Sequence, residues 1–223
     1  MHQDCLLSWS GGKDSALAYY EAKNSGRPSV LGLLTTVTGD YDRISMHGVR
    51  RELLLAQSRE LELPLHEVLI PKSASNEIYE SNTKSKLLEI RETQDISGVI
   101  FGDLFLQEIR SYREEFLGKL GLECFFPIWG KDTTKLASYF VESGFRAIIC
   151  CVDPKKLGRE FCGRDFDKDL LSELPEQVDP CGENGEFHTF VYGGPIFKHK
   201  INVRVGEIVE RDQFYFADIL PGS

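Results

Sequence analysis

The sequence has no apolar run long enough to cross a membrane. Its longest uninterrupted apolar stretches, such as residues 147–152, fall far short of the roughly 18–20 residues that a transmembrane helix needs. The first residues, Met1 to Asp4, also lack the basic segment that begins a secretory signal peptide. We therefore expect a cytoplasmic protein without a membrane partner.

A surplus of basic residues is missing as well. The 26 lysines and arginines are outnumbered by 35 aspartates and glutamates, so the formal net charge is -9 at pH 7. This balance makes nucleic acid and anionic lipid poor partners, although it allows a local basic pocket for a nucleotide. With 41 % hydrophobic and 27 % charged residues, the composition is typical of a globular protein and excludes a disordered, collagen-like or coiled-coil chain.

Cysteine pairs of the C-x-x-C type are absent, although the chain has six cysteines. A chain of 223 residues can bury a sizeable core without disulfide bonds, so we expect reduced and mostly buried thiols. The sequence leaves open whether any of them has a function. The six are Cys5, Cys124, Cys150, Cys151, Cys162 and Cys181.

The N-terminal half alternates strand-like and helix-like segments, which predicts an α/β fold with a mainly parallel sheet and crossover helices. The clearest helix is expected over 105–120, where five apolar residues fall on one helical face. These residues are Phe105, Ile109, Tyr112, Phe116 and Leu120. The other expected elements are strands at 5–9, 30–37, 65–70 and 99–101 and helices at 14–23, 49–63 and 75–95.

The pattern changes after Pro127, where we place the boundary between two domains, 1–127 and 128–223. Helices are expected at 133–143 and 167–174, with a buried strand at 147–152. From Phe187 onward, alternating apolar residues predict strands, with a turn at Gly206-Glu207. We therefore expect a smaller α+β domain at the C-terminus. Because no repeat or low-complexity linker separates the two parts, we expect them to share an interface.

The segment Ser10-Gly11-Gly12-Lys13-Asp14-Ser15 lies between the first expected strand and the first expected helix. There, backbone N–H groups and the positive end of a helix dipole form an anion site, and phosphate is the natural ligand. The glycines let the main chain approach the oxygens, the serines can donate hydroxyls, and Lys13 adds a positive charge. Asp14 cannot bind phosphate directly, so we expect it to help hold Mg²⁺ or to cap the helix.

Two common nucleotide-binding patterns do not describe this segment. A Walker A loop aligned on Gly12-Lys13 would need glycine at Leu7 and a hydroxyl side chain at Asp14. The G-x-G-x-x-G pattern is absent too. The alternative to a phosphate site is a flexible glycine turn that caps a helix.

The S-G-G-K-D-S segment resembles the PP-loop of the ATP pyrophosphatase superfamily, whose members split ATP between the α and β phosphates. The resemblance implies a Rossmann-like HUP domain, with a parallel sheet and helices on both faces, over 1–127. It implies pyrophosphate at Ser10 to Ser15 and adenine near Leu34 to Val37, where Thr35 lies. ATP and Mg²⁺ are the implied cofactors. The implied chemistry is adenylation of a substrate oxygen, followed by displacement of AMP by a nitrogen or sulfur nucleophile.

A second segment narrows the resemblance. Residues Pro180 to Thr189, followed by Gly194-Pro195, are similar to the E-x-G-E-[FY]-x-T segment of the diphthine ammonia ligase family. Gly102-Asp103 and the stretches 110–114 and 120–122 also resemble that family, so the resemblance covers essentially the whole chain. It implies an ATP-dependent amide ligase that uses ammonia and carries a family-specific C-terminal domain.

One stretch departs from the family pattern. The eukaryotic and archaeal ligases read more like G-A-x-x-S where this chain has Gly102-Asp103-Leu104-Phe105-Leu106. The form here resembles the bacterial branch, and bacteria do not make diphthamide. The resemblance therefore implies the reaction type and leaves the carboxylate acceptor open.

Glu183 and Glu186 lie three residues apart in a glycine-rich turn, with His188 close by. Gly182 and Gly185 let the backbone fold tightly enough for both carboxylates to converge. The group could then bind an ammonium ion, complete a metal site or orient the acceptor. A solvated acidic loop and a structural histidine are the alternatives.

Five further residues are candidates by position. Gly102 and Asp103 lie at and just past the carboxyl end of an expected strand, where ligands bind in open α/β sheets. Arg110 and Arg113, three apart on the expected helix, could form one anion-facing edge for the substrate or a plain solvated face. His47 follows the second expected strand and is expected beside the nucleotide.

Three functions are compatible with these features. In the first, an amide ligase, a substrate carboxylate attacks the α-phosphorus, Mg²⁺ and Lys13 stabilise pyrophosphate, and ammonia opens the acyl-adenylate. Its expected catalytic residues are Lys13, Asp14, Glu183 and Glu186. A tRNA-thiolating enzyme uses the same loop but needs persulfide-carrying cysteines and a basic surface. A non-catalytic adenine-nucleotide binder would release neither AMP nor pyrophosphate. The sequence does not decide between a monomer and a homodimer.

Overall fold

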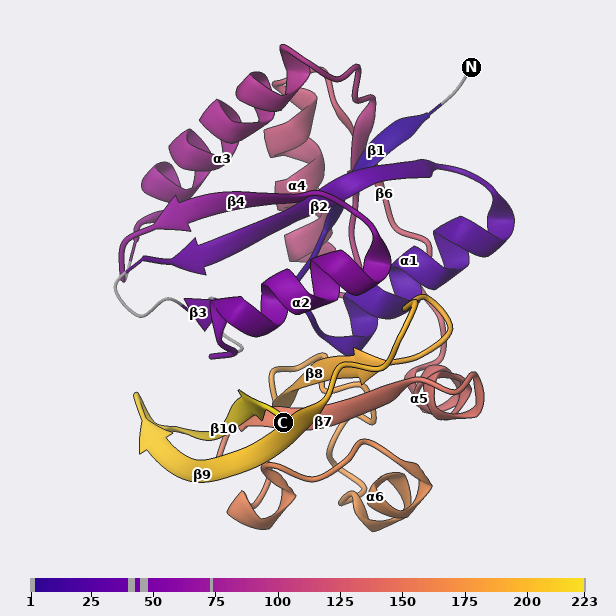
Figure 1. Cartoon of the computed structure of the whole chain (residues 1–223), viewed down its shortest axis with the longest axis vertical. Helices are drawn as coiled ribbons and strands as arrows, with labels where there is room; N and C mark the ends of the chain where they lie inside the picture. Colours follow the sequence, from indigo (N-terminus) through magenta and orange to yellow (C-terminus); the bar gives the residue numbers. More distant parts are fainter. Residues whose placement is uncertain (1–2, 40–42, 45–47, 73, 223) are drawn as a thin grey trace.

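The computed structural model describes residues 3–39, 43–44, 48–72 and 74–222. The chain forms two sheets, and helices accompany both (Figure 1). The first part contains β1 (Asp4–Ser8), α1 (Lys13–Ser25), β2 (Ser29–Thr38), β3 (Arg43–Ile44), α2 (Arg51–Leu61), β4 (Leu65–Ile70), α3 (Asn76–Arg91), β5 (Gly98–Ile100), α4 (Gln107–Gly118) and β6 (Glu123–Phe125). The second contains α5 (Thr133–Glu142), β7 (Arg146–Val152), the 3₁₀ turn η1 (Arg159–Phe161), α6 (Lys168–Glu173), β8 (Phe187–Gly193), β9 (Val203–Arg211) and β10 (Phe214–Pro221).

The first sheet has five parallel strands in the order β4-β2-β1-β5-β6. The short β3 pairs antiparallel with the end of β2. This is the doubly wound order, in which the chain builds outward from β1 in one direction and then crosses to β5 on its other side. The switch point between β1 and β5 is where such sheets bind ligands, so the predicted phosphate loop and Gly102 lie there together.

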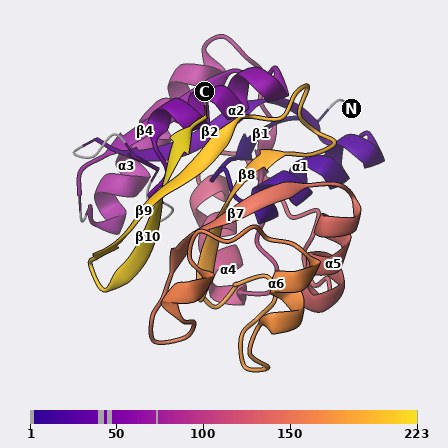
Figure 2. The ribbon, with the colours of Figure 1, turned by 60° about the horizontal axis from the view of Figure 1, so that its bottom comes forward.

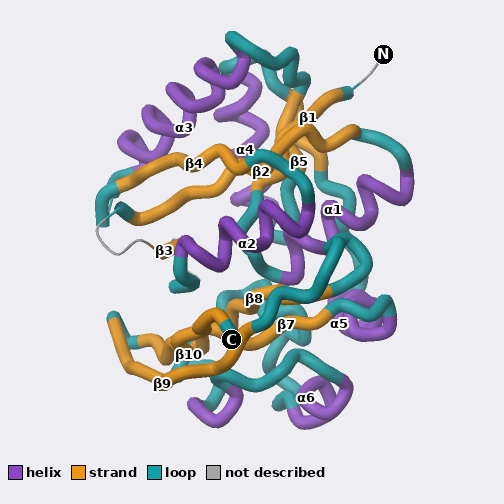
Figure 3. The backbone as a smooth tube through the Cα atoms, in the orientation of Figure 1, coloured by secondary structure: helices purple, strands orange, loops and turns teal. Residues whose placement is uncertain are grey.

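Helices cover both faces of this sheet because side chains alternate along its buried strands. Leu7 of β1 faces the layer of α1 and α2, whereas its neighbour Leu6 faces the layer of α3 and α4. Figure 3 shows the two helix layers on opposite sides of the sheet. The expected Rossmann-like α/β architecture is confirmed.

The second sheet is antiparallel, in the order β8-β7-β10-β9, and it packs under α1 and α2. Figure 2, turned so that this side comes forward, shows it in front of those helices. Aromatic residues of the second sheet and of α5 join the same buried cluster as α1 and α2; they include Phe140, Phe187 and Phe190. The two sheets thus share one hydrophobic core, as the lack of a linker suggested. None of the described helices has the length and apolar content that a membrane crossing requires.

Two details of the sequence prediction are wrong. The turn expected at Gly206-Glu207 lies inside β9, and the reversal occurs at Asp212 and Gln213. Their φ angles of 50° and 68° match a two-residue hairpin, which needs left-handed backbone at both positions.

The helix expected over 105–120 is shorter and less buried than its apolar stripe suggested. It runs from Gln107 to Gly118, and Phe105 and Ile109 remain 42 % and 40 % exposed. The helix starts beyond the carboxyl end of β5, and its first turn is largely exposed. Of its apolar stripe, Phe116 is the member that enters the core.

Candidate active site

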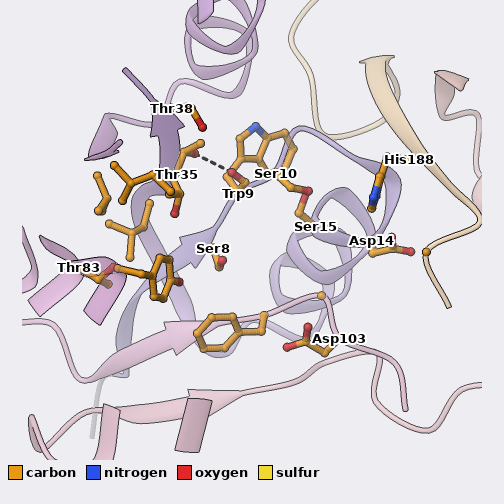
Figure 4. A pocket seen from close by; sticks show the side chains of 18 of the residues that line it. Ser8, Trp9, Ser10, Asp14, Ser15, Thr35, Thr38, Thr83, Asp103 and His188 are labelled. Atoms are coloured by element: carbon orange, nitrogen blue, oxygen red, sulfur yellow. Dashed lines mark hydrogen bonds between the residues drawn. The ribbon is translucent and has the colours of Figure 1, made fainter. Parts of the chain in front are cut away.

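A large cavity lies at the carboxyl ends of the parallel strands. Its volume is about 900 Å³. The loop after β1, the end of β2, the loop after β5 and the facing sides of α3 and α4 line it, together with residues of the C-terminal part. Figure 4 shows Ser10, Ser15 and Asp14 facing this space, with Asp103 and His188 nearby. Both parts of the chain therefore form one site.

The loop Ser10 to Ser15 has the conformation that an anion site needs. Gly11 has a φ of 78°, in the left-handed region, and α1 begins directly after Gly12. The Ser15 hydroxyl donates to the Gly12 carbonyl oxygen at 2.9 Å, which ties the loop to the first helical turn. The start of a helix, with its N–H groups and the positive end of its dipole, favours a phosphate at this point.

Gln57 holds this loop in place and was not found by the sequence analysis. Its side chain is fully buried and accepts a hydrogen bond from Trp9 Nε1 at 2.9 Å. Its amide nitrogen donates to the carbonyl oxygens of Gly11, at 3.0 Å, and Val191, at 2.6 Å. A glutamine on the apolar face of α2, between Leu53 and Leu61, was the available signal, because buried polar side chains need specific partners.

The edge strand of the second sheet also binds the loop. Val191 of β8 donates its backbone N–H to the Gly11 carbonyl oxygen at 2.8 Å. The backbone N–H of Lys13 donates to the Thr189 hydroxyl at 3.0 Å. The C-terminal part therefore fixes the backbone of the phosphate loop as well as lining the cavity.

Lys13 and Asp14 form a buried ion pair at the start of α1. Lys13 is 2 % exposed, and its Nζ lies 2.9 Å from both carboxylate oxygens of Asp14 and also donates to the Cys181 carbonyl oxygen. Burial lowers the pKa of Lys13, but Asp14, Cys181 and Glu183 together outweigh burial and leave that pKa above its ordinary value. Burial raises the pKa of Asp14, and Lys13 opposes the rise. The ammonium group thus stays charged inside the protein.

Gly102 and Asp103 lie against this ion pair. A Cβ atom at Gly102 would stand 2.7 Å from the carbonyl carbon and oxygen of Asp14, so only glycine fits. Asp103 takes two contacts from Arg113, at 2.7 Å to Nε and 3.1 Å to Nη2. The Arg113 guanidinium in turn lies 4.3 Å from the centroid of the Phe101 ring. Asp103 and Arg113 both line the cavity.

Glu183 reaches from the C-terminal part to the loop after β5. Its Oε1 accepts a hydrogen bond from the Leu104 backbone N–H at 2.9 Å. Burial, together with the nearby Asp14 and Asp103, raises the pKa of Glu183 to about 7, although the Leu104 N–H and Lys13 oppose the rise. A carboxylate with such a pKa can act as a proton acceptor near neutral pH.

Glu186 has different surroundings. Its side chain is 3 % exposed, and its Oε1 accepts hydrogen bonds from the Asp179 backbone N–H and from Asn184 Nδ2, both at 3.1 Å. It does not line the cavity, whereas Glu183 does. Glu183 therefore lies in the cavity, whereas Glu186 forms hydrogen bonds within its own loop.

Each of the two parts of the chain matches a known protein family. Residues 4–124 match the family described as Diphthamide synthase N-terminal domain, and residues 132–220 match Diphthamide synthase C-terminal domain. The chain belongs to the diphthamide synthase family. The family resemblance found in the sequence is thereby confirmed.

The relatives with curated names are all distant. The chain is 28 % identical to the diphthine--ammonia ligase of Schizosaccharomyces pombe over 222 residues, covering 90 % of this chain and 36 % of that protein. It is 26 % identical to the diphthine--ammonia ligase of Danio rerio over 233 residues, covering 94 % of this chain and 90 % of that protein. It is 30 % identical to the diphthine--ammonia ligase of Bos taurus over 138 residues, which cover 58 % of this chain and 51 % of that protein. The chain thus spans about a third of the yeast protein and most of the fish protein.

The other predicted site residues differ in where they lie. Thr35 and His188 line the cavity, and the Thr35 hydroxyl donates to the Trp9 carbonyl oxygen at 2.7 Å. Arg110 does not line it: Arg110 pairs with Glu114 at 2.8 Å and is stacked on aromatic rings. Arg110 and Arg113 therefore do not form a common edge. His47 lies outside the described residues.

The residues available for a metal are few. Within the described parts of the chain, no group of three or more His, Cys, Asp and Glu side chains could hold a metal ion. Mg²⁺ in nucleotide sites, however, is usually held by one or two carboxylates together with substrate phosphates. Asp14, at the phosphate loop and lining the cavity, fits that role. All six cysteines are free and, except for the half-buried Cys124, buried, as expected.

Proposed function

We propose that this chain is an ATP-dependent amide ligase that releases AMP and pyrophosphate. The observation that carries the proposal is the meeting, in one cavity, of the phosphate loop with its buried Lys13–Asp14 pair and of Glu183 from the C-terminal part. The loop suits the pyrophosphate of ATP, and Glu183 suits proton transfer. The names of the relatives, diphthine--ammonia ligase, agree with a carboxylate acceptor and with ammonia as the nitrogen donor.

The loop would promote the first half-reaction, in which the acceptor carboxylate attacks the α-phosphorus. The N–H groups at the start of α1 would bind the leaving pyrophosphate, and Lys13 would neutralise its charge. Mg²⁺, held by Asp14 and the phosphates, would supply further charge neutralisation. Arg113, beside Asp103, is the cation proposed to face the acceptor side.

Glu183 would serve the second half-reaction. Ammonia attacks the acyl carbon, the bond to AMP breaks, and the nitrogen loses a proton to form the neutral amide. With a pKa raised to about 7, Glu183 is partly ionised at neutral pH and can accept that proton. Glu186 would act indirectly, through the order of the loop that carries Glu183 and His188. On this proposal, 1–127 binds the nucleotide and 128–223 closes the acceptor side.

The thiolation alternative has less support. Burial is the main cause that raises the pKa of Cys150 well above its ordinary value and that of Cys151 to about 12, so neither thiol forms a reactive thiolate readily. The net charge of -9 also disfavours tRNA.

The proposal is tested by incubating the protein with Mg·ATP, ammonium and a panel of carboxylate acceptors. The expected products are AMP and pyrophosphate, formed only when an acceptor is present. Lys13→Ala should lower the rate at least about a hundredfold, because a charge that stabilises the leaving group is lost. The matched control is Lys119→Ala, at an exposed lysine, which should leave the rate unchanged. ADP and phosphate as the main products would refute the ligase, and ATP binding without turnover of any acceptor would favour the non-catalytic binder.

A further inference from the structure

The cavity continues from the phosphate loop into the apolar layer between the first sheet and helices α3 and α4. Leu34, Val68, Leu87, Val99 and Phe101 line it there, and all five belong to the buried core. A chamber with such walls suits a flat ring system better than it suits phosphates. It lies next to the end of β2, on the side of the loop opposite to Asp14 and His188 in Figure 4.

A buried hydroxyl in this chamber has no partner among the described residues. Thr83 of α3 is 5 % exposed and lines the cavity, and its Oγ1 makes no hydrogen bond with any described residue. A helical hydroxyl usually donates to the carbonyl oxygen four residues earlier. Ser85 of the same helix does so, to Ser81 at 2.9 Å, but Thr83 does not. Buried hydroxyls in native proteins are nearly always paired, so the exception calls for a ligand.

Thr83 lies on the face of α3 that borders the cavity. Asn76, Tyr79 and Leu87 stand on the same face, at helical spacing, and line the cavity too. Leu87 belongs to the core between α3 and the sheet, so this face is held against the strands. The hydroxyl therefore has a fixed position relative to β2, whose Thr35 also lines the cavity.

We propose that Thr83 recognises the base of the bound nucleotide, through a hydrogen bond between its hydroxyl and a polar atom on the edge of adenine. The inference rests on the proposed function, since it takes ATP as the ligand. A hydroxyl is both donor and acceptor, so it can pair with a ring nitrogen or with the exocyclic amino group. In an otherwise apolar chamber, one such bond orients the ring while the triphosphate reaches Ser10 to Ser15.

The proposal is tested with Thr83→Val, which keeps the shape of the side chain and removes only the hydroxyl. Calorimetric titration with Mg·ATP should show a dissociation constant raised about tenfold, the typical effect of one lost hydrogen bond. Titration with inorganic tripolyphosphate, which has no base, should be unchanged. The melting temperature should stay the same or rise, because a buried hydroxyl without a protein partner is replaced by a methyl group. Thr83→Ser should restore ATP affinity.

Ser85→Ala, on the same helix, is the matched control and should leave ATP affinity unchanged. The inference is overturned if Thr83→Val binds ATP as the wild type does, if it weakens tripolyphosphate equally, or if it lowers the melting temperature, which would reveal a partner within the protein. If the folded wild-type protein itself fails to bind ATP, the proposed function fails and the inference with it. Normal wild-type binding with an unaffected variant refutes the inference alone.

Discussion

Among the carboxylates that line the described cavity, Glu183 has the most strongly shifted pKa. It is largely removed from water, and Asp14 and Asp103 are close enough to disfavour its ionised form. The Leu104 N–H and Lys13 offset only part of these effects, and the pKa is raised from 4.5 to about 7. This value suits a group that must accept a proton at neutral pH and then release it.

Glu183→Gln tests that role. In the wild type, turnover should rise with pH through about 7 as the carboxylate becomes ionised, whereas the variant should be slow and should lack this rise. The measurement is acceptor-dependent pyrophosphate release from pH 5.5 to 8.5. Glu115→Gln, an exposed carboxylate paired with Lys119, serves as the control. An unchanged profile in Glu183→Gln would remove the residue from proton transfer.

The same pKa shift has an effect on stability. Because the folded protein holds the Glu183 proton up to about pH 7 and the unfolded chain releases it near 4.5, the stabilising effect is full below about 4.5 and is lost as the pH rises through about 7. The free energy of unfolding of the wild type, relative to that of Glu183→Gln, should therefore fall between pH 4.5 and 7. Urea denaturation at several pH values measures it.

At the scale of elements, the site depends on how closely the loop after β5 approaches the start of α1. Gly102 allows the two to touch, because a Cβ atom would stand 2.7 Å from the backbone of Asp14. This contact brings the Asp103–Arg113 pair and the Leu104 N–H beside the phosphate loop. The doubly wound strand order is what places both loops at one edge of the sheet.

Gly102→Ala should separate these two loops. We expect the free energy of unfolding to fall by about 1–3 kcal/mol, the usual effect of overpacking, and ATP affinity to fall with it. Chemical denaturation and ATP titration are the measurements. Gly118→Ala, in α4, is the matched control: a Cβ there meets nothing within 4 Å, so the helix should be stabilised by about 0.5–1 kcal/mol. Equal behaviour of the two variants would contradict the close contact.

At the scale of the molecule, the two sheets complete the cavity together. Gln57 joins α2, the phosphate loop and β8 by three hydrogen bonds, and Val191 and Thr189 add two bonds from β8 to the loop. Because β8 is an edge strand, it has backbone and side-chain groups available for a contact outside its sheet. The second sheet is thus a structural part of the cavity that we propose binds the nucleotide.

Gln57→Leu should weaken this junction. The Trp9 N–H and the Val191 carbonyl oxygen would be buried without partners, so we expect a loss of about 2–4 kcal/mol in unfolding free energy. ATP affinity should fall as well, since the loop loses its support. Gln107→Leu, on exposed α4, is the control. The two variants are compared by denaturation and by ATP titration, and a Gln57→Leu variant with wild-type ATP affinity would show that the loop holds its form without this residue.

Local patterns in the sequence were sufficient for the glycine loop between β1 and α1, the parallel sheet with helices on both faces, and the family. Each depends on residues close together in the chain: glycines between a strand and a helix, apolar periodicity, or a short motif. The hairpin at Asp212 and Gln213 escaped because Asp212 is followed by glutamine and not by the usual glycine, whereas Gly206 suggested a turn and lies within a strand.

Only the tertiary structure decided which side chains meet. The bond from the Leu104 N–H to Glu183, the junction at Gln57 and the chamber around Thr83 all join segments far apart in sequence. Their physical basis is burial: a polar group removed from water must find a partner, and the packing of the two sheets determines which partner is within reach. No local pattern contains that information.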